Sequence, residues 1–201
     1  MANLRLFIAL NLPEAIRKGL AAVQQNLQTQ TGPRVKWVEP ENLHLTLEFL
    51  GDVDENKVSL LKQILQQTVP NCPALELSLK GVGAFPHWRN PRVIWVGLGG
   101  DTLPLGQLQG KLHQALLEQG FRLEHKAFKP HLTLGRLKQR FQSPAALPVS
   151  ANLDLEKMAA RQTDILKPEA FTLNRVELMQ SVLTREGPIY TVLLSVVLPA
   201  K

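Results

Sequence analysis

A four-residue segment occurs twice in this 201-residue chain, and the repeat limits the possible folds more than any other feature. His44-Leu45-Thr46-Leu47 recurs 87 residues later as His131-Leu132-Thr133-Leu134. At the same offset, the apolar segment Phe7-Ile8-Ala9 falls on Ile94-Trp95-Val96. The chance that two of five histidines share this tetrapeptide is on the order of one in ten thousand, which supports a genuine motif. The sequence therefore predicts two similar halves, related by a pseudo-twofold axis that brings the histidines face to face.

A helical pattern of apolar residues lies between each apolar strand and its histidine motif. Gly120 follows the second pattern, where a glycine commonly ends a helix. Each half therefore reads as a strand, a helix, and a strand that carries the motif. The periodic positions are Ile16, Leu20, Val23 and Leu27 in the first half, and Leu105, Leu108, Leu112 and Leu116 in the second.

The remaining segments extend this plan to an α+β fold, a bilobal pseudo-twofold duplicate with antiparallel sheets flanked by helices. We expect one domain over residues 1–201. Asp52 and Glu55 are spaced as a variant capping box before a helix. That helix is expected near residues 54–69, strands near 74–81, 171–179 and 190–198, and loops at 81–91 and 143–148.

Side chains alternate across a strand, so the leucines of each motif share one face while the histidine and threonine share the other. His44 with Thr46, and His131 with Thr133, therefore each present an imidazole beside a hydroxyl. Phosphodiester cleavage without a metal needs a base, an acid and donors for the phosphoryl oxygens. Histidine suits both proton roles because its ordinary pKa is about 6.5. Arg136 adds a bidentate phosphate donor if the chain turns back after the motif.

Two other interpretations of the motifs compete with phosphodiester chemistry. A purely structural duplication is one, although a buried repeat does not need polar residues at both alternate positions. A zinc site of the two histidines with Glu48 is the other, but alcohol hydroxyls are poor zinc ligands. His113 falls on a helix and His125 in a charged stretch. His87 lies in an aromatic and basic segment, residues 85–92, that resembles RNA-contacting loops but is better interpreted as an exposed hairpin loop.

The charge balance favours an encounter with a polyanion. The net charge is +6 and the isoelectric point is near 9.7, and a basic surface attracts phosphate-bearing partners. The only cysteine, Cys72, allows no intrachain disulfide, which fits the reducing cytoplasm. The apolar run near the first residue is stopped by Asn11 and Pro13, and no stretch approaches the roughly 20 apolar residues of a membrane span. We expect a cytoplasmic monomer without a membrane partner.

Three segments of the chain carry a resemblance to a known family. They are residues 5–10, Arg-Leu-Phe-Ile-Ala-Leu; residues 37–51, from Trp37 through the first motif to Gly51; and residues 128–136, from Phe128 through the second motif to Arg136. They resemble the 2H phosphoesterases, and more narrowly the bacterial and archaeal RNA 2′,3′-cyclic phosphodiesterases, also called 2′-5′ RNA ligases. The resemblance implies a bilobal fold with the active site between the lobes. It also implies hydrolysis of an RNA 2′,3′-cyclic phosphate to a 2′-phosphate, with no metal or nucleotide cofactor.

The resemblance also implies roles for individual residues. His44 corresponds to the general acid that protonates the departing 3′ oxygen, and His131 to the base that activates water. Thr46 and Thr133 correspond to phosphate-binding residues, while Phe49 and Arg136 would pack on the terminal base. Strict alternation places Phe49 on the leucine face, so its role requires a bulge after Thr46. Joining of RNA ends through a 2′-5′ linkage is the reverse of ring opening and is therefore chemically accessible.

Two further functions remain open at this point. One is an RNA-end-binding module with little turnover, which needs phosphate donors but no acid and base pair. The other is a phosphodiesterase that acts on a small cyclic nucleotide or on an ADP-ribose cyclic phosphate. If RNA is the substrate, tRNA halves or short oligonucleotides with a 2′,3′-cyclic phosphate end are the expected partners.

Overall fold

The computed structural model describes residues 2–31, 34–124, 126–138, 156–157, 159–161 and 170–201. Its centre is a nine-stranded antiparallel sheet with the path β7-β4-β5-β6-β3-β1-β8-β9, and β2 pairs with β6. The strands are β1 (Asn3–Asn11), β2 (Val35–Trp37), β3 (His44–Asp54), β4 (Leu75–Phe85), β5 (Val93–Gly100), β6 (His131–Leu137), β7 (Phe171–Leu173), β8 (Arg175–Leu183) and β9 (Pro188–Val197). The helices include α1 (Glu14–Thr31), α2 (Val58–Thr68) and α3 (Thr102–Glu118), with short 3-10 turns η2 (Pro40–Asn42), η3 (Glu55–Lys57) and η4 (Val69–Asn71).

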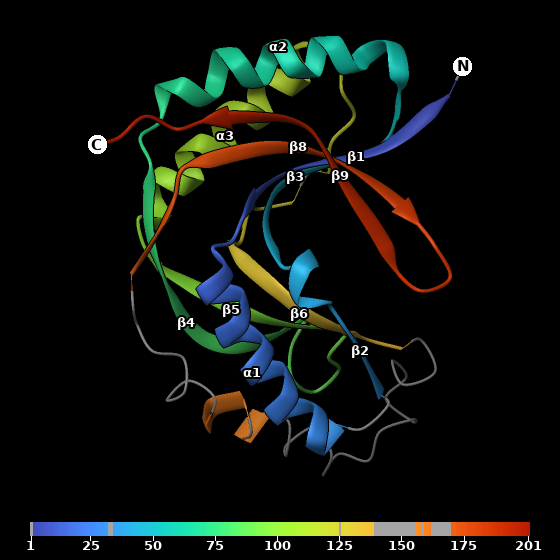
Figure 1. Cartoon of the computed structure of the whole chain (residues 1–201), viewed down its shortest axis with the longest axis vertical. Coiled ribbons are helices and arrows are strands. Elements are labelled where there is room, and N and C mark those ends of the chain that lie inside the picture. Colours follow the sequence, from blue (N-terminus) through green and yellow to red (C-terminus); the bar gives the residue numbers. More distant parts are fainter. Residues whose placement is uncertain (1, 32–33, 125, 139–155, 158, 162–169) are drawn as a thin grey trace.

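The sheet consists of two arms that meet at the motif strands. The first arm contains β3, β1, β8 and β9, and the second contains β6, β5, β4 and β7, with β2 also paired to β6. The pairing of β3 with β6 joins Leu45 to Leu132, which is the second residue of each motif. Figure 1 shows α1 beside the second arm and α2 with α3 beside β8 and β9 of the first. The predicted α+β duplicate with a pseudo-twofold between the motifs is confirmed.

The register of the two halves corrects one detail of the predicted repeat. Ala9 pairs with Thr46 on β3, whereas Trp95 pairs with Thr133 on β6. Ala9 therefore corresponds to Trp95, one residue away from the position that the motif offset predicts. The alignment of residues 7–9 with residues 94–96 is wrong by one residue because the connection to the motif is one residue longer in the second half. Such a slip matters in a strand because it exchanges the two faces.

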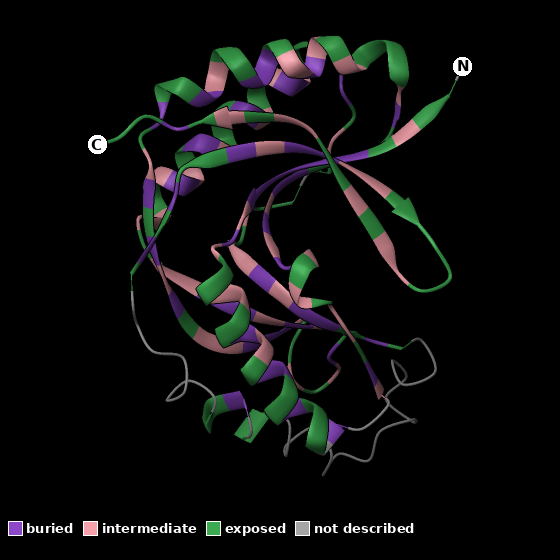
Figure 2. Cartoon of the chain, viewed as in Figure 1, coloured by how far each residue is buried: buried purple, intermediate pink, exposed green. Residues whose placement is uncertain are grey.

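The predicted helical stripes form the core against which the sheet packs. Leu20, Val23 and Leu27 of α1 are buried, and so are all four periodic leucines of α3. Figure 2 shows exposed and buried residues alternating along α1 and α2, as expected of amphipathic helices. Gly120 ends α3 as predicted: it has a φ of +76°, and the Phe121 N–H donates to the Leu116 carbonyl at 3.1 Å. No described helix has the length and apolar character that a membrane crossing requires.

Three boundaries differ from the sequence-based expectation. The turn η3 precedes α2, and its N-terminal cap is Asp54, whose carboxylate accepts from the Asn56 N–H at 2.9 Å, so the capping box at Asp52 and Glu55 is wrong. The strand expected over residues 171–179 is two strands that separate at Asn174, because β7 pairs with β4 and β8 pairs with β1. β4 continues to Phe85, which shortens the loop before β5. The loop expected at 143–148 lies outside the described residues.

One glycine of the second arm gives a direct test of this packing. A Cβ atom at Gly83 would lie 2.2 Å from Cζ2 of Trp95, its partner across the β4–β5 pair. We expect Gly83→Ala to lower the free energy of unfolding by about 1–3 kcal/mol, the usual cost of overpacking. The matched change Gly19→Ala in α1 meets no atom within 4 Å and should be stabilising by about 0.5–1 kcal/mol. Urea unfolding measures both, and equal effects would contradict the tight contact.

Candidate active site

Both motif strands carry a bulge at the last leucine of the motif. On β3, Leu47 has no partner between the pairs Ala9–Thr46 and Ile8–Glu48. A bulge adds one residue to a strand and so resets the alternation of its side chains. The same bulge occurs on β6 at Leu134, between the pairs Trp95–Thr133 and Ile94–Gly135.

The bulges turn Phe49 and Arg136 onto the face that carries the histidines. Leu47 and Glu48 are both buried, and Phe49 is 55% exposed. The bulge after Thr46 that the assignment of Phe49 required is therefore present. All six residues singled out by the sequence line one cleft of about 730 Å³: His44, Thr46, Phe49, His131, Thr133 and Arg136.

The register of the motif strands determines how these side chains face one another. Leu45 and Leu132 are paired and fully buried, so their neighbours in each motif project on the other face. In an antiparallel pair this register places each histidine opposite the threonine of the other strand, and the two histidines on a diagonal. Diagonal neighbours in a regular pair are about 7–8 Å apart, which leaves room for a phosphate between the imidazoles.

Both imidazoles are held by the same backbone contact. Nδ1 of His44 lies 2.7 Å from the carbonyl oxygen of Asn42, and Nδ1 of His131 lies 2.7 Å from that of Lys129. A carbonyl only accepts, so Nδ1 carries the hydrogen in each ring. Nε2 is consequently the nitrogen of each ring that can take up or release a proton.

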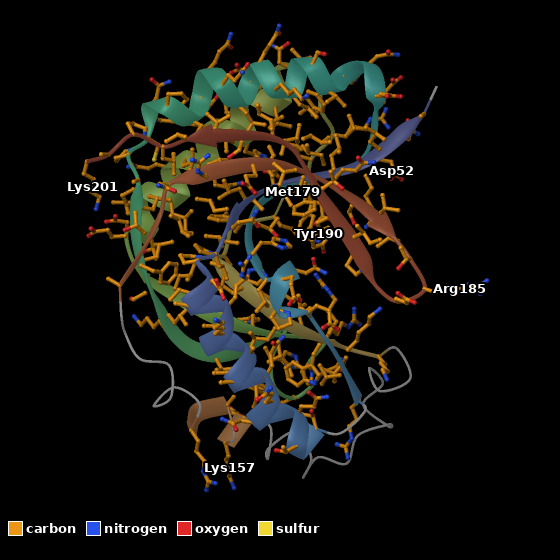
Figure 3. All side chains as sticks on the ribbon, viewed as in Figure 1. Asp52, Lys157, Met179, Arg185, Tyr190 and Lys201 are labelled. Carbon is orange, nitrogen blue, oxygen red and sulfur yellow. The ribbon has the colours of Figure 1, made fainter. Side chains whose placement is uncertain are left out.

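Aromatic rings flank each histidine. The centroid of the His44 ring lies 4.9 Å from that of Phe7 and 5.4 Å from that of Tyr190, with which it makes a T-shaped contact. Figure 3 places Tyr190 toward the middle of the molecule, whereas Arg185 marks the tip of the β8–β9 hairpin. Tyr190 comes from the C-terminal strand β9 and was not identified from the sequence.

The second histidine has equivalent aromatic neighbours from β4 and β5. The His131 ring is 4.9 Å from Phe85, in an edge-on contact, and 6.4 Å from Trp95. The exposed loop expected over residues 85–92 therefore begins with a residue of the site. The sequence indicated this role only in part, since Phe85 is the first residue of the aromatic and basic segment noted over residues 85–92.

Burial lowers the pKa of both catalytic candidates. It is the largest influence on His44 and on His131, and the nearby Arg136 guanidinium lowers both pKa values further. The carbonyls of Asn42 and Lys129 oppose this effect because they accept from the protonated ring. Without substrate the site therefore favours neutral imidazoles, which suits a base. A bound phosphate, being negative, would favour the protonated form that an acid requires.

The carboxylate proposed for a zinc site is engaged elsewhere. Glu48 is buried and accepts from His113 Nδ1 at 2.8 Å and from Gln109 Nε2 at 3.1 Å, both on α3. Residues within the described ranges form no group of three or more potential metal-ligating His, Cys, Asp or Glu side chains. His87 is exposed in the β4–β5 loop, and His125 lies outside the described residues.

A two-armed antiparallel sheet with a His-x-Thr strand from each arm lining one cleft defines the class of two-histidine phosphoesterases. Comparison with known protein families supports this class, because the sequence model of the family described as LigT-like phosphoesterase matches residues 10–95 and 101–190. The chain belongs to this family, and the resemblance drawn from its motifs is confirmed.

Several relatives are similar over most of the chain. An RNA 2′,3′-cyclic phosphodiesterase of Methanothermobacter thermautotrophicus is 34% identical over 94% of this chain and 96% of its own length. One of Thermotoga maritima is 35% identical over 94% of this chain and 93% of its own. Among solved structures, a Thermus thermophilus protein has a TM-score of 0.78 at 26% identity, covering 98% of this chain and 99% of its own. E. coli LigT complexed with 3′-AMP has a TM-score of 0.73 at 25% identity, covering 98% of both chains.

The lowered histidine pKa values predict how stability depends on pH. Because folding lowers the pKa of both rings below the ordinary 6.5, these rings bind more protons in the unfolded chain than in the folded protein as the pH falls. Their contribution to the free energy of unfolding is therefore present above the ordinary pKa of about 6.5 and is lost as the pH falls from there through the lower pKa of the folded protein. We expect the double variant His44→Asn with His131→Asn to show a smaller loss of stability over this interval than the unmodified protein, measured by urea unfolding.

The matched control for this prediction is His87→Asn, which removes an exposed histidine from the β4–β5 loop. It should leave the pH dependence close to that of the unmodified protein. An unchanged slope in the double variant would show that the two active-site rings do not account for the effect.

Proposed function

We propose that this protein is an RNA 2′,3′-cyclic phosphodiesterase that opens a terminal cyclic phosphate to a 2′-phosphate. The observation that carries the proposal is the pair of imidazoles in one cleft, each held through Nδ1 by the carbonyl two residues before it. This arrangement leaves two Nε2 atoms for proton transfer. The name shared by the relatives, and the complex of E. coli LigT with 3′-AMP, support an RNA end as the substrate.

The proposed reaction uses one histidine on each side of the phosphorus. Nε2 of His131 takes a proton from water, and the water oxygen forms a bond to phosphorus. The bond from phosphorus to the 3′ oxygen breaks, and Nε2 of His44 donates a proton to that oxygen. The product is a 2′-phosphomonoester with a free 3′ hydroxyl. We assign the base to His131 and the acid to His44 by their positions in the family.

Three further residues would stabilise the charge that develops on the phosphoryl oxygens. The hydroxyls of Thr46 and Thr133 can donate to the non-bridging oxygens, because each lies across the strand pair from a histidine. Arg136 lines the same cleft and adds a positive charge. Preorganised donors of this kind are usually the largest contribution to lowering such a barrier.

Phe49 and Arg136 would hold the terminal base. They occupy equivalent places after the two bulges, and the exposed Phe49 ring offers an aromatic surface to the cleft. A base between a phenyl ring and a guanidinium plane gains both stacking and cation–π attraction.

We further propose that residues 1–201 act as one bilobal domain, a cytoplasmic monomer that needs no metal or nucleotide cofactor. The continuous sheet through both arms supports a single domain. The substrates would be tRNA halves or short oligonucleotides with a 2′,3′-cyclic phosphate end. No feature of the described residues favours the small cyclic nucleotide or the RNA-end-binding module over this function.

The central test is hydrolysis of a short RNA with a 2′,3′-cyclic phosphate end in excess EDTA, with the product isomer identified. We expect a 2′-phosphate, and we expect His44→Ala and His131→Ala each to lower kcat at least about 100-fold, as loss of an acid or base does. His87→Ala is the matched control and should retain full activity. Unfolding curves would establish that the variants fold. Near-normal turnover in either active-site variant would remove that histidine from the mechanism.

The base-binding role of Phe49 has a separate signature. We expect Phe49→Ala to raise KM for adenosine 2′,3′-cyclic phosphate about tenfold while kcat changes little, because base stacking is worth about 1–3 kcal/mol and acts on binding. Leu103→Ala removes an exposed apolar side chain from α3, outside the cleft, and should change neither constant. A fall in kcat at unchanged KM would instead place Phe49 in the chemical step.

A further inference from the structure

A second cavity of about 770 Å³ adjoins the catalytic cleft, and the proposed hydrolysis uses none of its residues except those that it shares with the cleft. The two cavities share Thr46, Phe49, Glu124 and His131 as lining residues. His44 lines only the first of them. The second cavity, which we call the side chamber, therefore opens at the His131 end of the phosphate site.

The walls of the side chamber are largely apolar and include aromatic rings. Phe85 and Phe128 line it together with Leu47, Pro86 and Val93. Phe85 also contacts the His131 ring at 4.9 Å, so the aromatic wall continues to the proposed base. A cavity of this size and lining suits a flat aromatic group such as a nucleobase.

A buried polar pair gives this chamber the means to recognise such a base. Glu48 is only 8% exposed and lines the chamber together with Gln109. Among the described residues, the two side chains that donate to the Glu48 carboxylate, Gln109 and His113, both donate to Oε2. Oε1 is then the atom that can accept from a ligand. A carboxylate only accepts, so it favours a base edge with adjacent N–H groups, as guanine has.

The rim of the side chamber is basic. Arg92 and Lys129 are exposed lining residues, while Lys126 forms an ion pair with Glu124 at 2.7 Å. Exposed cations at an opening attract the phosphates of a nucleic-acid chain that extends from it.

We propose that the side chamber binds the 5′-terminal nucleoside of a second RNA strand, and so serves as the acceptor site for 2′-5′ joining. This inference rests on the proposed function. The acceptor's 5′ oxygen would occupy the place of the attacking water, beside Nε2 of His131. That histidine takes the 5′ hydroxyl proton, the 5′ oxygen bonds to phosphorus, the bond to the 3′ oxygen breaks, and His44 protonates the 3′ oxygen. The product is a 2′-5′ phosphodiester.

The reverse reaction provides the assay, because in water it is easier to follow. The 3′ hydroxyl of a 2′-5′-linked dinucleoside monophosphate loses its proton to His44 and attacks phosphorus, and the 5′ oxygen leaves with a proton from His131. The probe is adenylyl-(2′→5′)-guanosine, whose guanosine would lie in the side chamber. Its cleavage is compared with hydrolysis of adenosine 2′,3′-cyclic phosphate, which does not fill the chamber.

The decisive variant is Ala127→Trp, which adds an indole to an exposed residue that lines the chamber. We expect the ratio of dinucleotide cleavage to cyclic-phosphate hydrolysis to fall at least tenfold. Ala15→Trp makes the same change at an exposed position of α1 that lines neither cavity, and it should leave the ratio unchanged. An unchanged ratio in Ala127→Trp, or no dinucleotide cleavage by an unmodified protein that hydrolyses the cyclic phosphate, would overturn this inference alone. Absence of cyclic-phosphate hydrolysis would instead overturn the proposed function.

Base preference tests the polar end of the chamber independently. We expect the unmodified protein to cleave adenylyl-(2′→5′)-guanosine at least fivefold faster than adenylyl-(2′→5′)-uridine, relative to cyclic-phosphate hydrolysis. Glu48→Gln keeps the shape of the side chain but replaces one acceptor oxygen with a donor, so it should reduce this preference. Equal cleavage of both dinucleotides by the unmodified protein would contradict recognition of the base by Glu48.

Discussion

The pairing of Leu45 with Leu132 is the contact on which the rest of the site depends. Each leucine is fully buried beneath its own motif, and their pairing joins the two arms of the sheet at equivalent positions. Burial of these leucines fixes which face each motif strand turns to the cleft, and hence where both histidines lie. A one-residue slip of either strand would send its imidazole into the core. The hydrophobic core therefore determines the positions of the two imidazoles directly, because both stand on strands of the sheet.

Desolvation and backbone hydrogen bonding then give the two imidazoles their chemical properties. The aromatic rings of Phe7 and Tyr190 around His44 exclude water, which lowers its pKa and destabilises the charged ring. The carbonyl of Asn42 orients the ring so that Nε2 is available for proton transfer. The fold thus accepts two partly buried titratable groups whose protonation opposes folding. A protein selected for stability alone would replace them with apolar residues.

The parts of this structure that the sequence predicted are those governed by local periodicity. The leucines of α3, the end of that helix at Gly120 and the alternation within each motif follow from short-range rules. Features that depend on pairing between distant strands did not follow from those rules. The separation of β7 from β8 at Asn174 reflects their attachment to different arms, and Tyr190 reaches the site only because the C-terminal hairpin pairs with β1. The bulge was anticipated only because the family role of Phe49 demanded it.

Differences between the halves immediately after the two bulges explain how a symmetrical pair of histidines can have unequal roles. Glu48 and Gly135 occupy equivalent positions, since each directly follows the bulged leucine of its motif. Glu48 pairs with Ile8 of β1, and Gly135 pairs with Ile94 of β5. Glu48 reaches α3 and helps to line the side chamber. A Cβ at Gly135 would lie 2.6 Å from the Val35 side chain, so glycine is what allows β2 to pack along β6. The position after the first bulge therefore places a buried carboxylate at the side chamber, whereas the equivalent position after the second bulge leaves room for β2 beside β6. In the mechanism that we propose, the two sides of the phosphate would meet these different surroundings, and the duplicated motifs would supply an acid on one side and a base on the other.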